Sequence, residues 1–131
     1  MRKFLSIILS FIVCVTASYA WDVVKIGGIY YRIITGSHTA EVLGRDYNYY
    51  KITNEDSTRV VIPAYVTYND ISYRVTVVNA HAFEKDKNLS YISLPNTITL
   101  IGTRAFSGCK NLESIDLPNS VKKRRIGHLL G

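Results

Sequence analysis

Cysteine and histidine are scarce in this chain, and their scarcity excludes several kinds of protein. Of two cysteines, Cys14 lies in an N-terminal segment expected to be removed, so Cys109 has no intrachain disulfide partner. The three histidines lie in unrelated segments, and none has a cysteine or carboxylate at the spacing of metal ligands. No glycine-rich loop of the phosphate-binding kind is present either. The sequence therefore indicates no disulfide framework, no metal and no cofactor.

The first twenty residues have the pattern of an export signal. Arg2 and Lys3 form a short positive region, residues 4–15 are almost wholly apolar, and Ser18-Tyr19-Ala20 offers the small residues that a signal peptidase needs. The apolar run is too short for a stable transmembrane helix. We expect residues 1–20 to be a signal peptide cleaved after Ala20. The mature chain would then be exported, extracellular or at the cell surface, and without a transmembrane segment.

The net charge is modest. The formal charge of +6 falls to +4 when Arg2 and Lys3 are removed with the leader. A surplus of this size favours solubility and is too small to indicate a nucleic-acid partner. An exported domain this small, without disulfides, must be stabilised by a continuous apolar core. A stack of repeats is one architecture that provides such a core.

The chain contains an internal repeat. Residues 75–97 and 98–120 align at a shift of 23 without a gap, and ten positions are identical. A period of 23 lies within the range of leucine-rich repeats, and the spacing Leu89-x-x-Ile92-x-Leu94 matches their strand signature. The alternation around Ile92 and Leu94 predicts a strand with one buried face, and such strands bury a continuous core when stacked in parallel.

The second copy, residues 98–120, resembles the BspA-like class of bacterial surface leucine-rich repeats. The resemblance is carried by Ile98-Thr99-x-Ile101-Gly102, by Ala105-Phe106-Ser107-Gly108-Cys109 and by Leu117-Pro118-Asn119-Ser120. It implies a solenoid and adhesion to proteins of a host or of neighbouring cells. Thr97 and Ser120 stand where a conventional leucine-rich repeat has its asparagine ladder, which argues against that ladder and leaves the solenoid intact.

The expected fold is mostly β, a leucine-rich-repeat solenoid with short helical or 3₁₀ turns. Each Ala-Phe pair, Ala82-Phe83 and Ala105-Phe106, belongs to such a turn with the Phe pointing inward. Asn88 and Asn111 are expected to bond their local backbone at the turn into the strand. Residues 75–121 form the two repeats, and residues 21–74 form a β-rich N-terminal cap.

Three sequence features define the cap. Val23–Ile26 and Ile29–Thr35 flank Gly27-Gly28, which predicts a hairpin, because two glycines supply the positive φ angles of a two-residue turn. Residues 66–68 and 71–77 flank Asn69-Asp70 and predict a second hairpin. Val60-Val61-Ile62-Pro63 resembles Ser93-Leu94-Pro95 and predicts a degenerate first strand of the stack. The tyrosines of this region are expected to fill sheet faces, with Asp46–Tyr50 as the candidate for an exposed aromatic patch.

Residues 122–131 form a basic, incomplete third repeat or tail. After Val121 the first core position is Arg124, and no phenylalanine follows. The edge of the last strand is therefore expected to be open. One hypothesis is that the chain is a truncated fragment of a longer surface repeat protein and has no independent activity. The basic run Lys122-Lys123-Arg124-Arg125 suggests another hypothesis, that the chain binds polyanions, although no aromatic residues interleave with the charges.

No catalytic grouping emerges from the sequence. His81 occupies the repeat position of Arg104, which indicates a solvated site, and Glu55-Asp56 lies in a polar run typical of a turn. Cys109 has no base beside it and fits a core or turn filler. We expect no enzyme. The leading hypothesis is protein binding or adhesion through the concave face, where the outward strand residues gather: Ser90, Tyr91, Ser93, Glu113, Ser114 and Asp116.

Overall fold

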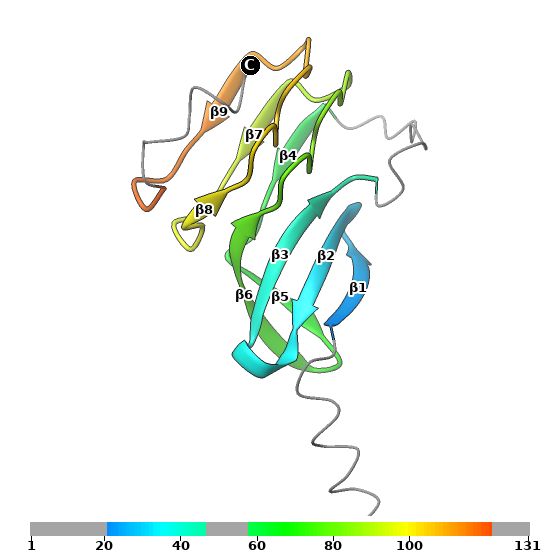
Figure 1. Ribbon diagram of the computed structural model, residues 1–131, viewed down its shortest axis with the longest axis vertical. Coiled ribbons are helices and arrows are strands. Elements are labelled where there is room, and N and C mark those ends of the chain that lie inside the picture. The colour runs from blue at the N-terminus through cyan, green and yellow to red at the C-terminus, as the bar shows by residue number, and fades with distance from the viewer. Residues whose placement is uncertain (1–20, 47–57, 122–131) are drawn as a thin grey trace, which may run out of the picture.

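The computed structural model describes residues 21–46 and 58–121, and the structural statements below concern these residues. Their strands form two sheets that follow one another along the molecule (Figure 1). The larger sheet has the order β1-β2-β3-β6-β5, with β8 paired to β6, and the smaller has the order β4-β7-β9. The strands are β1 (Trp21–Ile26), β2 (Ile29–Ile34), β3 (Thr39–Gly44), β4 (Arg59–Val61), β5 (Tyr65–Tyr68), β6 (Ile71–Val78), β7 (Tyr91–Ser93), β8 (Leu100–Ile101) and β9 (Ser114–Asp116).

Both predicted hairpins are present. β1 and β2 pair antiparallel up to Ile26 opposite Ile29, and the turn between them has φ of 56° at Gly27 and 83° at Gly28. Two positive φ angles define the type I′ turn, whose twist matches that of the flanking strands. β5 and β6 also pair antiparallel, and Asn69 and Asp70 adopt φ of 49° and 61° in their turn.

The sheet of the N-terminal region continues into the repeats. β3 pairs in parallel with β6, and β6 pairs in parallel with β8 through Val77–Leu100 and Val78–Ile101. β6 therefore runs across the predicted boundary at residue 74, and its end forms the first rung of a repeat wall. A 3₁₀ helix, η1 (Thr35–Ser37), joins β2 to β3.

The smaller sheet is the strand wall of the solenoid. β4, β7 and β9 pair in parallel, with Val60 opposite Ile92 and Ile92 opposite Ile115. The prediction of a degenerate first strand at Val60-Val61-Ile62-Pro63 is confirmed, since β4 lies in the position of one further repeat. Val60 and Ile92 are buried, and the side chains on either side of them are turned outward.

The Ala-Phe segments form the opposite wall, as a run of tight turns rather than a continuous 3₁₀ helix. Each turn of the solenoid is called a coil below. The N–H groups of Ala82, Glu84 and Asp86 donate to the carbonyl of the residue three positions earlier in the same coil, at 3.1–3.3 Å. The N–H groups of the alternate residues donate to the next coil: His81 to Thr103, Phe83 to Ala105 and Lys85 to Ser107. Since every second donor leaves the coil, no helix can propagate.

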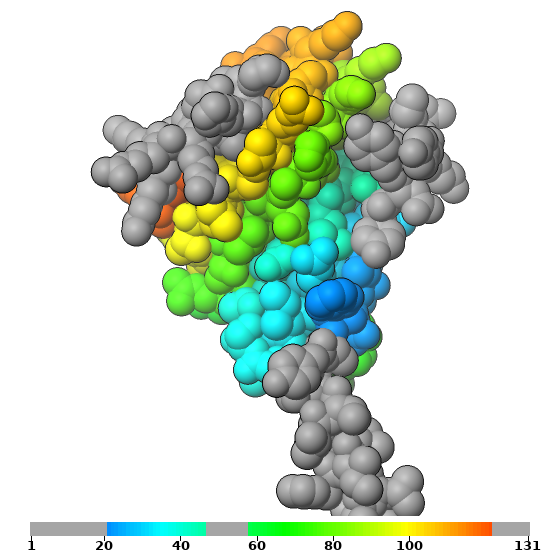
Figure 2. Space-filling view, in the orientation of Figure 1, coloured from blue at the N-terminus to red at the C-terminus, as the bar shows by residue number. Residues whose placement is uncertain are grey.

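The core lies between the two walls. Phe83 and Phe106 are 2% and 1% exposed, and their rings stack with centroids 5.6 Å apart and planes 7° apart. The predicted inward position of both phenylalanines is confirmed. Leu89 and Ile92, which follow Phe83 in the same repeat, are completely buried. Figure 2 shows successive segments of the chain as parallel bands across one face, as expected for stacked coils.

Candidate binding face

Nine residues of the strand wall form one outward-facing surface, which we call the β4–β7–β9 face. The strand registers place Arg59, Tyr91 and Ser114 in one row, and Val61, Ser93 and Asp116 in the next. A third row precedes the strands, in which the N–H and hydroxyl of Ser90 donate to the carbonyl of Thr58 and the N–H of Glu113 donates to the carbonyl of Ser90. Neighbouring strands of a sheet lie about 4.8 Å apart, so these side chains are close neighbours.

The six residues predicted from the repeats all lie on this face. Tyr91 and Ser93 belong to β7, Ser114 and Asp116 belong to β9, and Ser90 and Glu113 come directly before these strands. Glu113, Ser114 and Asp116 are exposed, and the other three are partly exposed. The hydroxyl of Ser93 donates to Oδ2 of Asp116 at 3.5 Å, a contact that links the two repeats on the outward side.

The sequence analysis missed the contribution of β4. The guanidinium of Arg59 lies over the ring of Tyr91, 4.0 Å from its centroid, and the side chain of Val61 is 70% exposed. The signal was present in the likeness of Val61-Ile62-Pro63 to Ser93-Leu94-Pro95, which assigns these residues to the same rows. With β4 included, the face is not simply acidic, because it carries a cation at one side.

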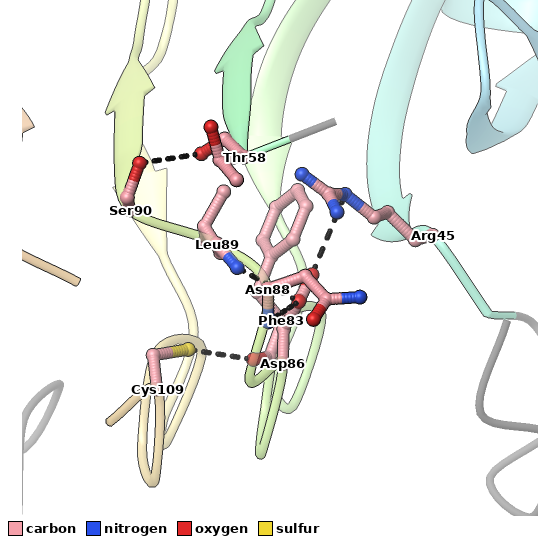
Figure 3. A network of polar contacts seen from close by, with 8 residues as sticks. All are labelled: Arg45, Thr58, Phe83, Asp86, Asn88, Leu89, Ser90 and Cys109. Carbon is pink, nitrogen blue, oxygen red and sulfur yellow. Dashed lines mark hydrogen bonds and ion pairs between the residues drawn. The ribbon is translucent and has the colours of Figure 1, made fainter. Parts of the chain in front are cut away.

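A second group of polar contacts joins the coils at the turn wall (Figure 3). Oδ1 of Asp86 accepts the backbone N–H groups of Asn88 and Leu89, each at 3.1 Å. Oδ2 of the same carboxylate lies 3.4 Å from Nε of Arg45, and both side chains are largely buried. The carboxylate thus fixes the turn into β7 and joins it to the segment after β3. The described contacts of this carboxylate are with two backbone N–H groups and with Arg45, which indicates a structural role for it.

The predicted local role of Asn111 needs a correction. Nδ2 of Asn111 donates to the carbonyl of Lys87 in the preceding coil, at 2.6 Å, rather than to its own turn. At the earlier turn the capping acceptor is Asp86, and Asn88 supplies a backbone donor. The physical reason is the stacking: a carbonyl of the neighbouring coil lies within reach of the amide, so it competes with the local backbone.

Cys109 occupies a structural position, as predicted. Its thiol donates to the carbonyl of Phe83 at 2.9 Å, across the coil interface. Burial raises the pKa of this thiol above its usual range, to about 11. The neutral thiol is therefore the form that the fold favours at physiological pH, and a thiolate nucleophile is not.

Cys109 is accordingly expected to react slowly with iodoacetamide at pH 8. The raised pKa reduces the thiolate fraction about 100-fold relative to the unfolded chain, and alkylation requires the thiolate. Mass spectrometry of the peptide that contains Cys109 measures the alkylation rate in buffer. The same reaction in about 8 M urea, which unfolds small domains, gives the reference rate. Equal rates in buffer and in urea would show that the thiol is not held in this contact. The native rate should rise steeply as the pH approaches 11.

Other candidate groups do not converge. Nδ1 of His81 lies 2.6 Å from Oε2 of Glu84 on the exposed turn wall, which agrees with the predicted solvated position. Within residues 21–46 and 58–121 no three side chains of the metal-binding types form a cluster. The same residues contain no helix with the length and hydrophobicity to cross a membrane. Several sequence predictions fall outside the described residues: the predicted signal peptide, Tyr47, Tyr49, Tyr50, Glu55-Asp56 and the tail from Lys122.

Comparison with known families agrees with the repeat geometry. Residues 64–127 match a family model described as a BspA type leucine rich repeat region of six copies. No curated protein sequence matches the chain.

Solved bacterial leucine-rich-repeat structures share the fold. A protein from Bacteroides capillosus is 28% identical with a TM-score of 0.64, over 76% of this chain and 67% of that one. A protein from Bacteroides ovatus is 34% identical with the same TM-score, over 76% of this chain and 24% of that one. A leucine rich cell surface protein from Faecalibacterium prausnitzii is 24% identical with a TM-score of 0.62, over 77% and 26%. By its repeats and these likenesses, the chain has the leucine-rich-repeat fold, and its residues 64–127 form a leucine-rich-repeat region of the BspA type.

Proposed function

We propose that this chain is an exported module, secreted or held at the cell surface, that binds another protein through the β4–β7–β9 face and catalyses no reaction. The observation that carries the proposal is the face itself. Three parallel strands present a continuous surface of exposed or partly exposed polar side chains around the aromatic ring of Tyr91. Tyrosine and arginine are enriched among residues that dominate binding energy at protein interfaces, and here Arg59 stacks on Tyr91.

The comparisons support a protein-binding role at the level of the family. One structural neighbour is a cell surface protein of Faecalibacterium prausnitzii, and the family is built from repeats that present extended surfaces. The chain spans 67%, 24% and 26% of the three neighbours above, so arrays of this kind also occur in longer proteins. Adhesion to a host or neighbouring-cell protein is the role that we assign to the face.

Replacing Tyr91 and Asp116 together with alanine is expected to reduce partner capture about tenfold or more, because an interface tyrosine commonly contributes that much. The probe is a mixture of biotinylated surface proteins from host epithelial cells and from neighbouring bacteria. The readout is the amount of each protein retained by the immobilised chain. Both substitutions are outward, so the thermal midpoint should stay near that of the wild type.

A matched variant tests whether the loss is specific to this face. Tyr65→Ala with Asp22→Ala removes one tyrosine and one aspartate from exposed positions on β5 and β1, outside the face. It should retain the proteins that the wild type retains. If the Tyr91 and Asp116 variant captures the same proteins in the same amounts, the assignment of the binding face is wrong.

A further inference from the structure

The turn wall, on the side of the solenoid opposite the β4–β7–β9 face, carries an excess of positive charge. Residues 79–88 and 102–111, the two segments of this wall, contain four lysine or arginine residues and two acidic residues. All four cations are exposed: Lys85, Lys87, Arg104 and Lys110. Among the residues that the structure describes, none of these four side chains forms an ion pair. The wall therefore presents cations to solvent without a matching set of anions.

The two carboxylates of the wall are engaged by groups of the fold. Oε2 of Glu84 lies 2.6 Å from Nδ1 of His81, and the Glu84 side chain is only 10% exposed. The Asp86 side chain is 15% exposed, accepts two backbone N–H groups and pairs with the buried Arg45 (Figure 3). What remains at the surface of the wall is mainly the charge of its four cations.

One of these cations extends from the first coil over the second. Gly108 is the repeat equivalent of Lys85, and a Cβ atom at Gly108 would lie 3.2 Å from Cγ of Lys85. The stem of Lys85 therefore passes over the space that this glycine leaves open, in the coil that carries Arg104 and Lys110. Lys87 is the repeat equivalent of Lys110, so these two side chains start from neighbouring coils. The four cations are thus gathered on two adjacent coils.

The backbone at Lys85 favours glycine rather than lysine. Lys85 has φ of 60°, in the left-handed region, and Gly108 has φ of 74° at the same place in the next coil. His81 and Arg104, which are equivalent to each other, also have positive φ, 63° and 56°. Strained backbone of this kind is concentrated at functional positions. A lysine where glycine fits better indicates that its charge serves a purpose other than folding.

An extended polyanion suits this surface better than a single anion. Arg104 and Lys110 are six residues apart, which is about 12 Å even at the compact rise of a 3₁₀ turn. Nucleic acid fits less well, because bases of single strands stack on exposed aromatic side chains. The aromatic residues of the wall, Phe83 and Phe106, are buried. A sulfated glycan carries repeated negative charge without bases, and flexible lysine side chains can follow its sulfate groups.

We propose that the turn wall binds a sulfated glycan chain. The glycan lies across the two coils, and its sulfate groups pair with the cations of the wall: Lys85, Lys87, Arg104 and Lys110. This site goes beyond the proposed function, because it lies on the opposite side of the solenoid from the β4–β7–β9 face. A protein and a glycan can therefore be bound at the same time.

Surface plasmon resonance on immobilised heparin tests the proposal with the full chain. The wall variant replaces all four cations with glutamine: Lys85→Gln, Lys87→Gln, Arg104→Gln and Lys110→Gln. It is expected to bind heparin about tenfold or more weakly, because each cation that pairs with a polyanion releases a counterion. For the same reason, the wild-type affinity should fall steeply as salt is raised, and that of the wall variant should fall much less.

The basic tail supplies a matched control. The tail variant also removes four positive charges, through Lys122→Gln, Lys123→Gln, Arg124→Gln and Arg125→Gln. It should keep most of the heparin affinity and the steep dependence on salt. If the tail variant loses binding while the wall variant keeps it, the site is the tail and the inference is wrong.

Lys85→Gly separates binding from stability. Glycine relieves the left-handed strain at this position, so the thermal midpoint should stay the same or rise. Heparin binding should nevertheless weaken, and its salt dependence should become shallower. An unchanged affinity would show that Lys85 does not contact the glycan.

The choice of glycan tests the ligand class. Desulfated heparin should bind much more weakly than heparin, and so should a single-stranded DNA of equal total charge. If either binds as tightly as heparin, or if heparin does not bind the wild type, a sulfated glycan is not the ligand. The capture experiment on Tyr91 and Asp116 decides the proposed function independently, since these residues lie on the β4–β7–β9 face.

Discussion

Replacing Gly44 with alanine is expected to leave the chain unable to reach its native fold. Gly44 ends β3 with φ of +109°, a conformation that alanine adopts only with strain. A Cβ atom there would lie 1.7 Å from the carbonyl oxygen of Ala82 and 2.7 Å from its carbonyl carbon. Both are backbone atoms, so no side-chain rotation can relieve the overlap. β3 would have to move away from the turn wall, which would open the core between them.

The far-ultraviolet circular dichroism and the thermal melt of Gly44→Ala measure this effect. Gly27→Ala is the matched control, because Gly27 also has positive φ, +56°, yet a Cβ atom there has no neighbour within 4 Å. It should cost only about 1 kcal/mol of left-handed strain and still melt cooperatively. A Gly44→Ala protein that melts within a few degrees of the wild type would contradict the close approach of β3 to Ala82.

Phe83→Ala is expected to lower the free energy of unfolding by about 3–5 kcal/mol, the usual cost of removing a buried phenylalanine. Phe83 is 2% exposed, stacks on Phe106, and lies in the coil that the first and last described coils both contact. Small domains are stabilised by only about 5–15 kcal/mol in total, so this single change removes a large share. Urea denaturation followed by circular dichroism gives the midpoint and the slope.

Leu100→Ala provides the comparison, since Leu100 is 46% exposed on β8. Its truncation should change stability by less than about 1 kcal/mol, as is usual for surface positions. A loss at Phe83 no larger than the loss at Leu100 would show that the phenylalanine stack does not hold the two coils together. Phe83→Leu, which keeps an apolar side chain of intermediate size, should fall between the two.

Much of the fold follows from local patterns in the sequence. The period of 23 located β7 and β9, because identical apolar spacing in adjacent repeats requires equivalent positions in the stack. Gly27-Gly28 and Asn69-Asp70 located the two hairpins, since both turns require backbone with positive φ. The pairing of β3 with β6 was not predicted, because segments that neither repeat nor share a turn carry no local signal of contact. The close approach of Gly44 to Ala82 was not predicted, for the same reason.

The candidate face was predicted for two of its three strands. Arg59 and Val61 were missed because the β5–β6 hairpin separates β4 from β7 by more than one repeat length, so the match at a shift of 23 does not reach them. The buried pair of Arg45 and Asp86 was also beyond sequence reasoning, since nothing local to either residue names the other. Whether the nine residues bind a partner is the proposal that the experiments above test.

The alternating hydrogen bonds of the turn wall imply a rule of parity for changes in repeat length. From His81 to Asp86, odd-numbered N–H groups reach the adjacent coil and even-numbered ones stay within their own. Inserting one residue would exchange the two sets downstream and direct the wrong donors toward the neighbour. Inserting two would restore the assignment and add a further turn. Length variation in such walls is therefore expected in steps of two, whereas the β5–β6 hairpin shows that the chain between β4 and the first full repeat accommodates a longer insertion.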